Sequence, residues 1–141
     1  MLHQFLVGGG ASLCNITVHA LVMAAVVRVS HFTATHTTEP TLRLIAVMVA
    51  VVSVLMAAHV VEVIIWSLVY AIVGAASAGV DLLYFAFVNY TTLGYGDVIP
   101  VERWRLLGPV TAMNGVLLFG WSTAVIFQVL HRTMQQGWDV Q

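Results

Sequence analysis

Three long apolar segments constrain this chain more than any other feature of its sequence. They run from about Phe5 to Val29, from about Leu42 to Val73, and from about Leu106 to Leu130. Each is long enough for the roughly 20 apolar residues that a helix needs to cross a bilayer. Only 8% of the residues are charged, whereas a soluble domain carries roughly 25%. We therefore predict an all-α integral membrane protein with three transmembrane helices.

Charge and cysteine content exclude several other classes of protein. The net charge is −1 and all positive charge comes from five arginines, so nothing indicates a nucleic-acid partner. A single cysteine, Cys14, excludes an intrachain disulfide, and we expect it to be a small apolar residue in a helix. No nucleophile triad or paired catalytic carboxylates occur, so we predict neither an enzyme nor a small-molecule substrate. Nothing basic precedes the first span, which we interpret as a retained helix rather than a cleaved signal.

Two connections separate the apolar segments. Residues 30–40 are polar and rich in threonine, which predicts a loop; Thr38 would cap the next helix, with Glu39 and Pro40 in its first turn. Residues 74–79 hold two glycines, Gly74 and Gly79, and favour a break between helices. The alternative is that the spacing of Gly74 and Ala78 marks close helix packing.

A shorter apolar segment, residues 80–90, follows the second connection. It is too short to cross a bilayer, so we predict a re-entrant half-helix. Asp81 would lie in its first turn, where a carboxylate suits the helix macrodipole. The predicted order is therefore span, span, half-helix, loop and span.

The loop after this half-helix, residues 91–97, has glycine at two alternate positions, Gly94 and Gly96. Glycine adopts backbone angles that other residues avoid, so successive carbonyl groups can point the same way. Such a row of oxygens replaces the hydration shell of a cation, and four loops around one axis would complete its rings. The rings would come from the carbonyls of four consecutive residues, Thr92, Leu93, Gly94 and Tyr95. The Thr92 hydroxyl would add an innermost ring. None of these side chains is charged, which suits a monovalent ion.

The segment Thr91-Thr92-Leu93-Gly94-Tyr95-Gly96-Asp97 resembles the signature sequence of the potassium channel pore-domain family. Leucine stands at the place of the valine in TVGYG. The resemblance extends from about Tyr84 to Leu130, through the aromatic pair Tyr84-Phe85, Pro100 and Trp104 after the loop, and Gly115 at the place of a hinge glycine. The two earlier spans resemble small bacterial ion-channel proteins only in general outline.

This resemblance implies a potassium-selective channel subunit that forms a homotetramer and conducts K⁺ passively, without an organic cofactor. The ion-binding filter would be Thr92 to Gly96, with K⁺ held at Thr92, Leu93, Gly94 and Tyr95. Tyr95 would pack against aromatic residues of the half-helix, and Asp97 would hydrogen-bond behind the filter at its outer mouth. Thr91, Asp97, Tyr84 and Phe85 would support the filter. Many family members place a glutamate in the half-helix as the partner of Asp97, but Val88 stands there, which puts any filter closure that depends on a carboxyl pair in doubt.

Three alternatives remain open at this point. One is a weakly selective cation channel, which the intact Gly94-Tyr95-Gly96 disfavours. Another is a potassium-uptake transporter, although such chains carry four loops and this chain carries one. The last is a pore subunit that conducts only beside a different partner chain.

Polar residues in two spans are further candidates for the site. Thr111, Asn114 and Gly115 in the third span are predicted cavity or gate residues; the alternative for Asn114 is a hydrogen bond to a neighbouring helix, and for Gly115 close packing. In the second span, spacings of three, four and four place His59, Glu62, Trp66 and Tyr70 on one helix face. His59 and Glu62 would form a pH-sensitive pair, because histidine titrates near neutral pH; alternatively, the face is a polar seam that ties this helix to its neighbours. His19 in the first span is expected to be a packing or interface residue.

The resulting organisation has three parts. Residues 1–40 form an additional N-terminal transmembrane helix and loop, 41–134 the pore domain, and 135–141 a short tail. With the filter facing outside, Arg28, Arg43 and Arg132 lie inside the cell, a slight positive-inside bias. We expect a multi-pass protein of a cell membrane, of the bacterial inner-membrane type, without an arginine-rich voltage sensor.

Overall fold

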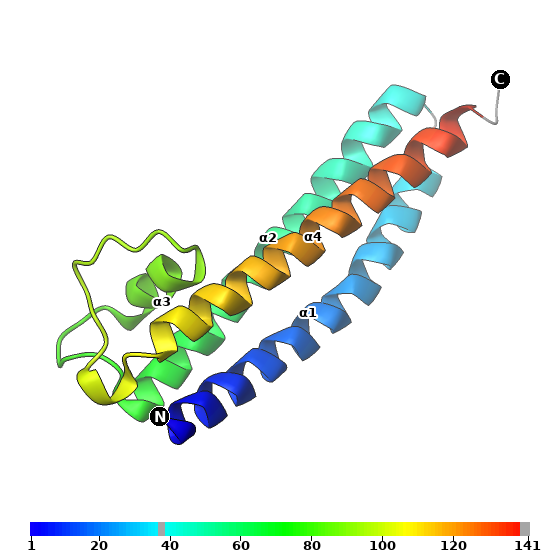
Figure 1. Ribbon diagram of the computed structural model, residues 1–141. Coiled ribbons are helices and arrows are strands. Elements are labelled where there is room, and N and C mark those ends of the chain that lie inside the picture. Colours follow the sequence, from blue (N-terminus) through cyan, green and yellow to red (C-terminus); the bar gives the residue numbers. More distant parts are fainter. Residues whose placement is uncertain (37–38, 139–141) are drawn as a thin grey trace.

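The computed structural model describes residues 1–36 and 39–138, which form a bundle of long helices (Figure 1). The elements are α1 (Leu2–His36), α2 (Pro40–Val73), the short α3 (Leu82–Tyr90), a 3₁₀ turn (Glu102–Trp104) and α4 (Leu107–Trp138). In the part of the chain that the structure describes, three helices are long and apolar enough to span a membrane: α1, α2 and α4. The predicted all-α fold with three such helices is confirmed.

The first connection is shorter than the sequence predicts. We expected a loop from residue 30, but α1 continues to His36. Hydroxyl groups in this stretch bond within the helix: Ser30 donates to the Val27 carbonyl at 2.9 Å and Thr35 to the Phe32 carbonyl at 2.8 Å. Polar side chains satisfied in this way do not break a helix. Glu39 is the N-cap of α2 and Pro40 its first residue; the predicted cap Thr38 lies outside the described residues.

The second connection is a break between helices, as predicted. Gly74 caps the C-terminus of α2 in the left-handed region, with φ of 62°. The Ala75 amide donates to the Tyr70 carbonyl at 2.9 Å, which satisfies a carbonyl of the last turn. Gly74 therefore ends the helix instead of marking a close helix–helix crossing.

The short helix α3 packs at one end of the bundle, against α2 and the beginning of α4 (Figure 1). Asp81 is its N-cap rather than a first-turn residue, because its carboxylate accepts from the amides of Leu83 at 3.0 Å and Tyr84 at 3.1 Å. The core at this end joins large side chains from three helices: Trp66, Tyr70, Phe85, Tyr90 and Leu107.

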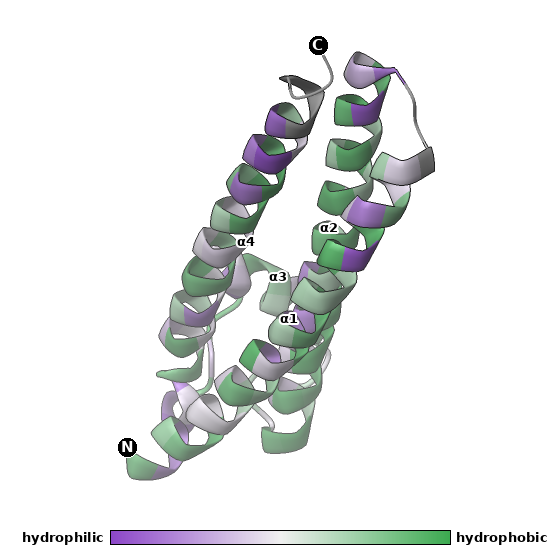
Figure 2. Cartoon of the chain, turned by 90° about the vertical axis from the view of Figure 1, so that its right-hand side faces the viewer, coloured by the Kyte–Doolittle hydropathy of each residue, from purple (hydrophilic) through white to green (hydrophobic). Residues whose placement is uncertain are grey.

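The outer surface of the bundle is apolar along most of its length (Figure 2). In the most apolar stretches of α1 and α2, only 22% of the residues are buried inside the chain. A continuous apolar surface of this size is stable in lipid and not in water. Some exposed hydroxyls in the middle of the helices, those of Thr17, Ser53 and Thr123, bond to carbonyls of their own helix.

Candidate functional site

The loop at residues 91–97 has an unusual backbone. Among the described residues, Thr92 is the one non-glycine residue with positive φ, at 60°, and Gly94 and Gly96 have φ of 59° and 78°. Positive and negative φ therefore alternate from residue 92 to residue 96, which turns successive peptide groups toward the same side. Glycine adopts positive φ freely, but threonine does so at a cost of about 1–3 kcal/mol. We predicted this freedom for the two glycines and missed it for Thr92.

The beginning of the loop is anchored on the C-terminal end of α3. The Leu93 amide donates to the Val88 carbonyl at 2.9 Å, and the Thr92 amide donates to the Asn89 carbonyl at 3.0 Å. The Thr91 hydroxyl donates to the Phe87 carbonyl at 2.7 Å. The last turn of α3 thus fixes the loop, and the negative end of its macrodipole lies beside it.

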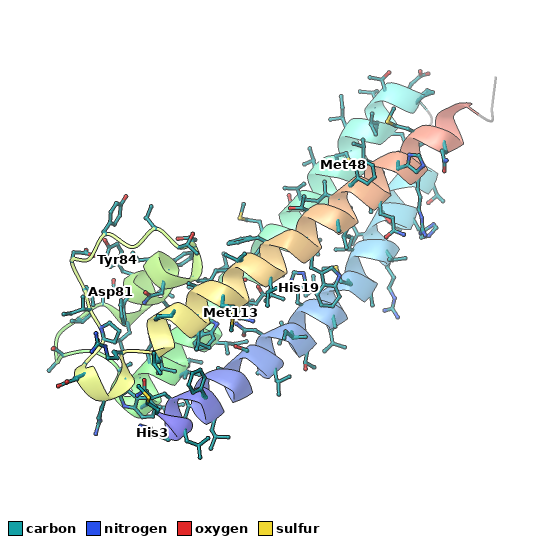
Figure 3. All side chains as sticks on the ribbon, in the orientation of Figure 1. His3, His19, Met48, Asp81, Tyr84 and Met113 are labelled. Atoms are coloured by element: carbon teal, nitrogen blue, oxygen red, sulfur yellow. The ribbon has the colours of Figure 1, made fainter. Side chains whose placement is uncertain are left out.

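The far end of the loop is anchored by Tyr84 and Asp97. The Tyr84 hydroxyl donates to Asp97 Oδ2 at 2.7 Å, and Asp97 Oδ1 accepts from the Val98 amide at 3.1 Å. Because the Asp97 carboxylate accepts a bond from the neutral phenol, it raises the pKa of Tyr84 above the ordinary value of 10.0. The helix α3 therefore does have a partner for Asp97, and it is Tyr84 instead of a carboxylate at position 88. Tyr84 and Asp81 are labelled beside this loop in Figure 3.

The other two aromatic residues of the predicted site are Phe85 and Tyr95. Phe85 is buried and packs on Tyr70 of α2, with ring centroids 5.0 Å apart. Tyr95 is 67% exposed, so most of its ring is uncovered in the single chain. The predicted filter, Thr92 to Gly96, and the flanking residues Thr91 and Asp97 are all exposed.

A second polar site lies inside the bundle, centred on Glu62. Its carboxylate contacts His19 Nδ1 at 2.8 Å, His59 Nδ1 at 2.9 Å and the hydroxyl of Tyr90. Glu62 and His19 are fully buried, and the side chain of His59 is 12% exposed. Figure 3 shows His19 in the middle of the bundle, on α1. This cluster joins α1, α2 and α3.

Ser122 of α4 completes the cluster. Its Oγ lies 3.0 Å from Nε2 of His59 and 3.4 Å from Nε2 of His19. An ionised Glu62 only accepts, so each Nδ1 carries a hydrogen, and the single Ser122 hydrogen can reach only one Nε2. All of these bonds form together when the other Nε2 is also protonated. The pattern of these bonds therefore depends on how many protons the two histidines carry.

A second layer of hydrogen bonds continues from this cluster toward α3. Asn114 Oδ1 accepts from Asn15 Nδ2 at 3.1 Å and from Trp66 Nε1 at 3.0 Å. The Tyr70 hydroxyl lies 2.6 Å from Thr111 Oγ1, and Thr111 donates its own hydrogen to the Leu107 carbonyl at 2.8 Å, so Tyr70 is the donor. We call both layers together the polar seam; its side chains are Asn15, His19, His59, Glu62, Trp66, Tyr70, Tyr90, Thr111, Asn114 and Ser122.

The predicted single polar face of α2, formed by His59, Glu62, Trp66 and Tyr70, is confirmed, and it ties α2 to α3 and α4. His19 does more than pack, because it brings α1 into the same network. The sequence interpretation missed Asn15, Tyr90 and Ser122. The spacing of Asn15 and His19, four residues apart on an otherwise apolar helix, was a usable signal.

His19, His59 and Glu62 also bring one potential metal-ligand atom each to within 4.8 Å of one another. Each of these atoms already makes a hydrogen bond inside the seam. We therefore assign the three residues to a hydrogen-bonded network.

The predicted cavity residues lie on the buried face of α4. Thr111 is fully buried and Asn114 is 2% exposed, and both bond to neighbouring helices. A Cβ placed on Gly115 would overlap the carbonyl of Tyr90, whereas one placed on Gly120 would meet nothing within 4 Å. Gly115 therefore permits the close contact between α4 and the end of α3, and α4 is one continuous helix through it.

These features define a helical membrane protein with several spans and a short helix followed by an ordered, solvent-facing loop. The comparison with protein families identifies it further: a family model described as an ion channel matches residues 58–132, more than half of the chain. The chain belongs to this ion channel family, and passive ion conduction follows from that membership. Searches of the curated proteins and of the solved structures found no match to this chain.

Proposed function

We propose that this chain is the subunit of a potassium-selective channel, in which four copies surround one ion pathway. The observation that carries the proposal is the alternation of positive and negative φ over residues 92–96 in an exposed, anchored loop. This alternation directs the carbonyls of Thr92, Leu93, Gly94 and Tyr95 to one side. One loop supplies one quarter of each oxygen ring, so four chains are required.

The short helix α3 supports the same proposal. Its nine residues span about 13.5 Å, less than half of a hydrocarbon core of about 30 Å. It therefore enters the membrane without crossing it, and its last turn delivers the filter to membrane depth. The negative end of its macrodipole favours a cation there. The uncharged carbonyl rings suit a monovalent ion, K⁺, which must also leave the site readily.

The ion cavity is formed by the exposed side of α4. Thr111 and Asn114 are already covered within one chain, and assembly of subunits only covers more surface. The opposite stripe of α4 is open, with Met113 60% and Leu117 61% exposed, followed by Gly120 one turn further on. Figure 3 shows Met113 near the beginning of α4, close to α3. We assign the lining of the cavity to this stripe.

The orientation follows from the arginines. The filter loop and the N-terminus lie at one end of the bundle, and the C-terminal end of α4 lies at the other (Figure 1). Arg28, Arg43 and Arg132 lie toward the second end, and two arginines, Arg103 and Arg105, follow the filter. This slight positive-inside bias, three arginines against two, supports an orientation with the filter outside the cell membrane. We propose a multi-pass protein of the bacterial inner-membrane type. The matched residues 58–132 fall inside the proposed pore domain, 41–134.

The decisive experiment is the reversal potential of the purified protein in a planar bilayer, with K⁺ on one side and Na⁺ on the other. A potential close to the K⁺ equilibrium value is expected, and Gly94→Ala should abolish it because alanine is strained at φ of 59°. Gly79→Ala is the matched control. Gly79 also has positive φ, 86°, but lies before α3 and outside the filter, so selectivity should survive.

Two other outcomes would identify a different function. A clear current that reverses near zero would mean a weakly selective cation channel. No current from a correctly sized tetramer, with current restored on addition of a membrane extract, would mean a pore subunit that needs a different partner chain. The mass of the purified complex in detergent tests the homotetramer directly.

The polar seam favours a second, regulatory proposal, in which His59 and Glu62 form a pH-sensitive pair. The titratable groups that face each other here are His19 of α1, His59 and Glu62 of α2 and Tyr90 of α3, while α4 contributes the neutral Ser122. If both Nε2 atoms carried a proton, the Ser122 hydroxyl would lose its acceptor in the cluster, and the cluster would gain positive charge in a buried place. Tyr90 immediately precedes the filter segment, so the seam is in direct contact with it.

A further inference from the structure

A groove of about 270 Å³ lies between α1 and α4, in the half of the bundle away from the filter. It begins beside the polar seam at Trp121 and Met23 and extends toward the C-terminal ends of both helices. Trp121 is 39% exposed, and its ring lies 5.1 Å from that of His19, measured between centroids. The groove is therefore open at the surface and adjoins the seam at its inner end.

The lining of the groove changes from apolar to polar along its length. On α4 it passes from Trp121 and Val125 to Gln128 and Arg132, which occupy successive turns over about 16 Å. On α1 it passes from Met23 and Val27 to Ser30 and His31, in the same direction. The groove thus has an apolar floor within the bundle and a polar, cationic mouth near the helix ends.

The charge at the mouth has no counterpart within the described residues. Arg132 is exposed and makes no ion pair with any residue that the structure describes. Arginine holds phosphate well, because its planar guanidinium presents several donors to phosphate oxygens. In a membrane, the molecule that joins a phosphate to a long apolar chain is a phospholipid. An acidic phospholipid, whose phosphate is not balanced by a cation in its own headgroup, complements the charge of Arg132 best. In the proposed orientation this end of the bundle lies in the cytoplasmic leaflet, which supplies such lipids.

We propose that the groove binds an anionic glycerophospholipid, with its phosphate on Arg132 and one acyl chain lying along Val125 toward Trp121. The groove residues on α4 are rotated by about 100° from the exposed stripe at Met113, Leu117 and Gly120, so the lipid would not enter the proposed cavity. A bound chain would hold the far halves of α1 and α4 together beside His19. This inference rests on the proposed membrane location and orientation and not on potassium selectivity.

The test uses fluorescence quenching of Trp121 by brominated lipid. The full chain is reconstituted in phosphatidylcholine vesicles that contain increasing fractions of brominated phosphatidylglycerol. The Trp121 signal is the difference between the natural protein and Trp121→Phe. Saturable quenching is expected at a low fraction of phosphatidylglycerol, and brominated phosphatidylcholine should require a much higher fraction.

Charge variants identify the headgroup site. Arg132→Gln should raise the phosphatidylglycerol fraction needed for half-maximal quenching by about fivefold, the effect of one arginine near an anionic lipid. Arg28→Gln is the matched control, because Arg28 lies toward the same end of the bundle but does not line the groove. Circular dichroism and the elution volume of each variant establish that it is folded.

Three results would overturn the proposal. Equal quenching by both lipids would mean that the groove takes any acyl chain. An equal effect of Arg28→Gln and Arg132→Gln would mean general attraction to a charged surface. No quenching of Trp121 by either lipid would mean that a neighbouring subunit covers the groove. Because none of these measurements uses K⁺ current, they are distinguishable from failure of the proposed channel function.

Discussion

His19 Nδ1 lies 2.8 Å from Oε1 of Glu62, and both side chains are fully buried although they are 43 residues apart. The contact joins α1 to α2 at the cluster that also includes Tyr90, next to the proposed filter segment. Asn15, one turn earlier on α1, adds bonds to Asn114 and to the Glu62 carbonyl. The first helix is therefore an integral part of the bundle and not a detached membrane anchor.

Removal of the Glu62 carboxylate should destabilise the protein strongly. Glu62→Ala leaves the buried His19, the part-buried His59 and the Tyr90 hydroxyl without the carboxylate that they contact, and loss of one partner of a buried pair costs about 3–5 kcal/mol. Glu62→Gln keeps one carbonyl oxygen and should cost less. The measurement is the temperature at which the detergent-solubilised protein loses its folded elution peak.

Thr17→Val is the control for this series. Thr17 lies on α1 between Asn15 and His19, but its hydroxyl is exposed and bonds to the Leu13 carbonyl within the same helix, at 2.8 Å. Its replacement should leave the melting temperature within about a degree of the natural protein, since surface substitutions are worth less than about 0.5 kcal/mol. If Glu62→Ala melts where Thr17→Val does, the seam does not stabilise the bundle.

Channel activity at fixed voltage should fall as the pH is lowered from about 8 to about 5.5, the range in which histidine gains a proton. The sign follows from the network, because protons on both Nε2 atoms would add positive charge to a buried cluster and leave the Ser122 hydroxyl without an acceptor there. His59→Gln should flatten the pH profile. His131→Gln is the control, because His131 is exposed and outside the seam. A profile that is flat in the natural protein, or unchanged by His59→Gln, would exclude the pH-sensitive pair.

Tyr84→Phe should shorten the time for which the filter stays conductive during a long voltage step, because it removes the bond to Asp97. Asp97→Asn should act in the same direction, and the double variant should be no worse than the more severe single one, since both remove the same bond. Additive effects would mean that the two residues act separately.

The same bond predicts the behaviour of the filter at high pH. The phenol must be neutral to donate, and the Asp97 carboxylate raises the pKa of Tyr84 above 10.0. The bond is therefore present below pH 10.0 and is lost only as the pH rises through this raised value. Up to about pH 10, ionisation of Tyr84 should therefore not change the conduction lifetime. Any pH dependence of the lifetime in this range should be the same in the natural protein and in Tyr84→Phe.

Gly115→Ala should prevent assembly of a conducting channel, because its methyl group would overlap the Tyr90 carbonyl at the start of the filter segment. The Tyr90 carbonyl belongs to the backbone at the end of α3, so it can move away only if α3 shifts against α4. Overpacking of this kind costs about 1–3 kcal/mol. Gly120→Ala, on the same helix with open space around it, should assemble normally. The yield of tetramer on size exclusion and the single-channel current compare the two. Equal yields and currents would show that the contact of Gly115 is not needed.

Much of the fold was predictable because it depends on residues that are near one another in the sequence. The apolar segments, the helix break at Gly74 and the short α3 follow from composition and from glycine positions. The end of α1 was predicted too early, since the polar hydroxyls of Ser30 and Thr35 bond within the helix instead of ending it. Spacing also placed the polar residues of α2 on one face.

The sequence by itself determined that the chain crosses a membrane, that four residues of α2 share a face, and that a loop with alternate glycines follows a half-helix. Only the tertiary structure decided which side chains meet: His19 with Glu62, Tyr84 with Asp97, and Gly115 with the Tyr90 carbonyl. Helical spacing shows which residues share a face. It does not show which neighbouring helix that face packs against, because this depends on contacts between residues far apart in the chain. The same contacts buried Thr111 and Asn114 and left the stripe of Met113 and Leu117 open.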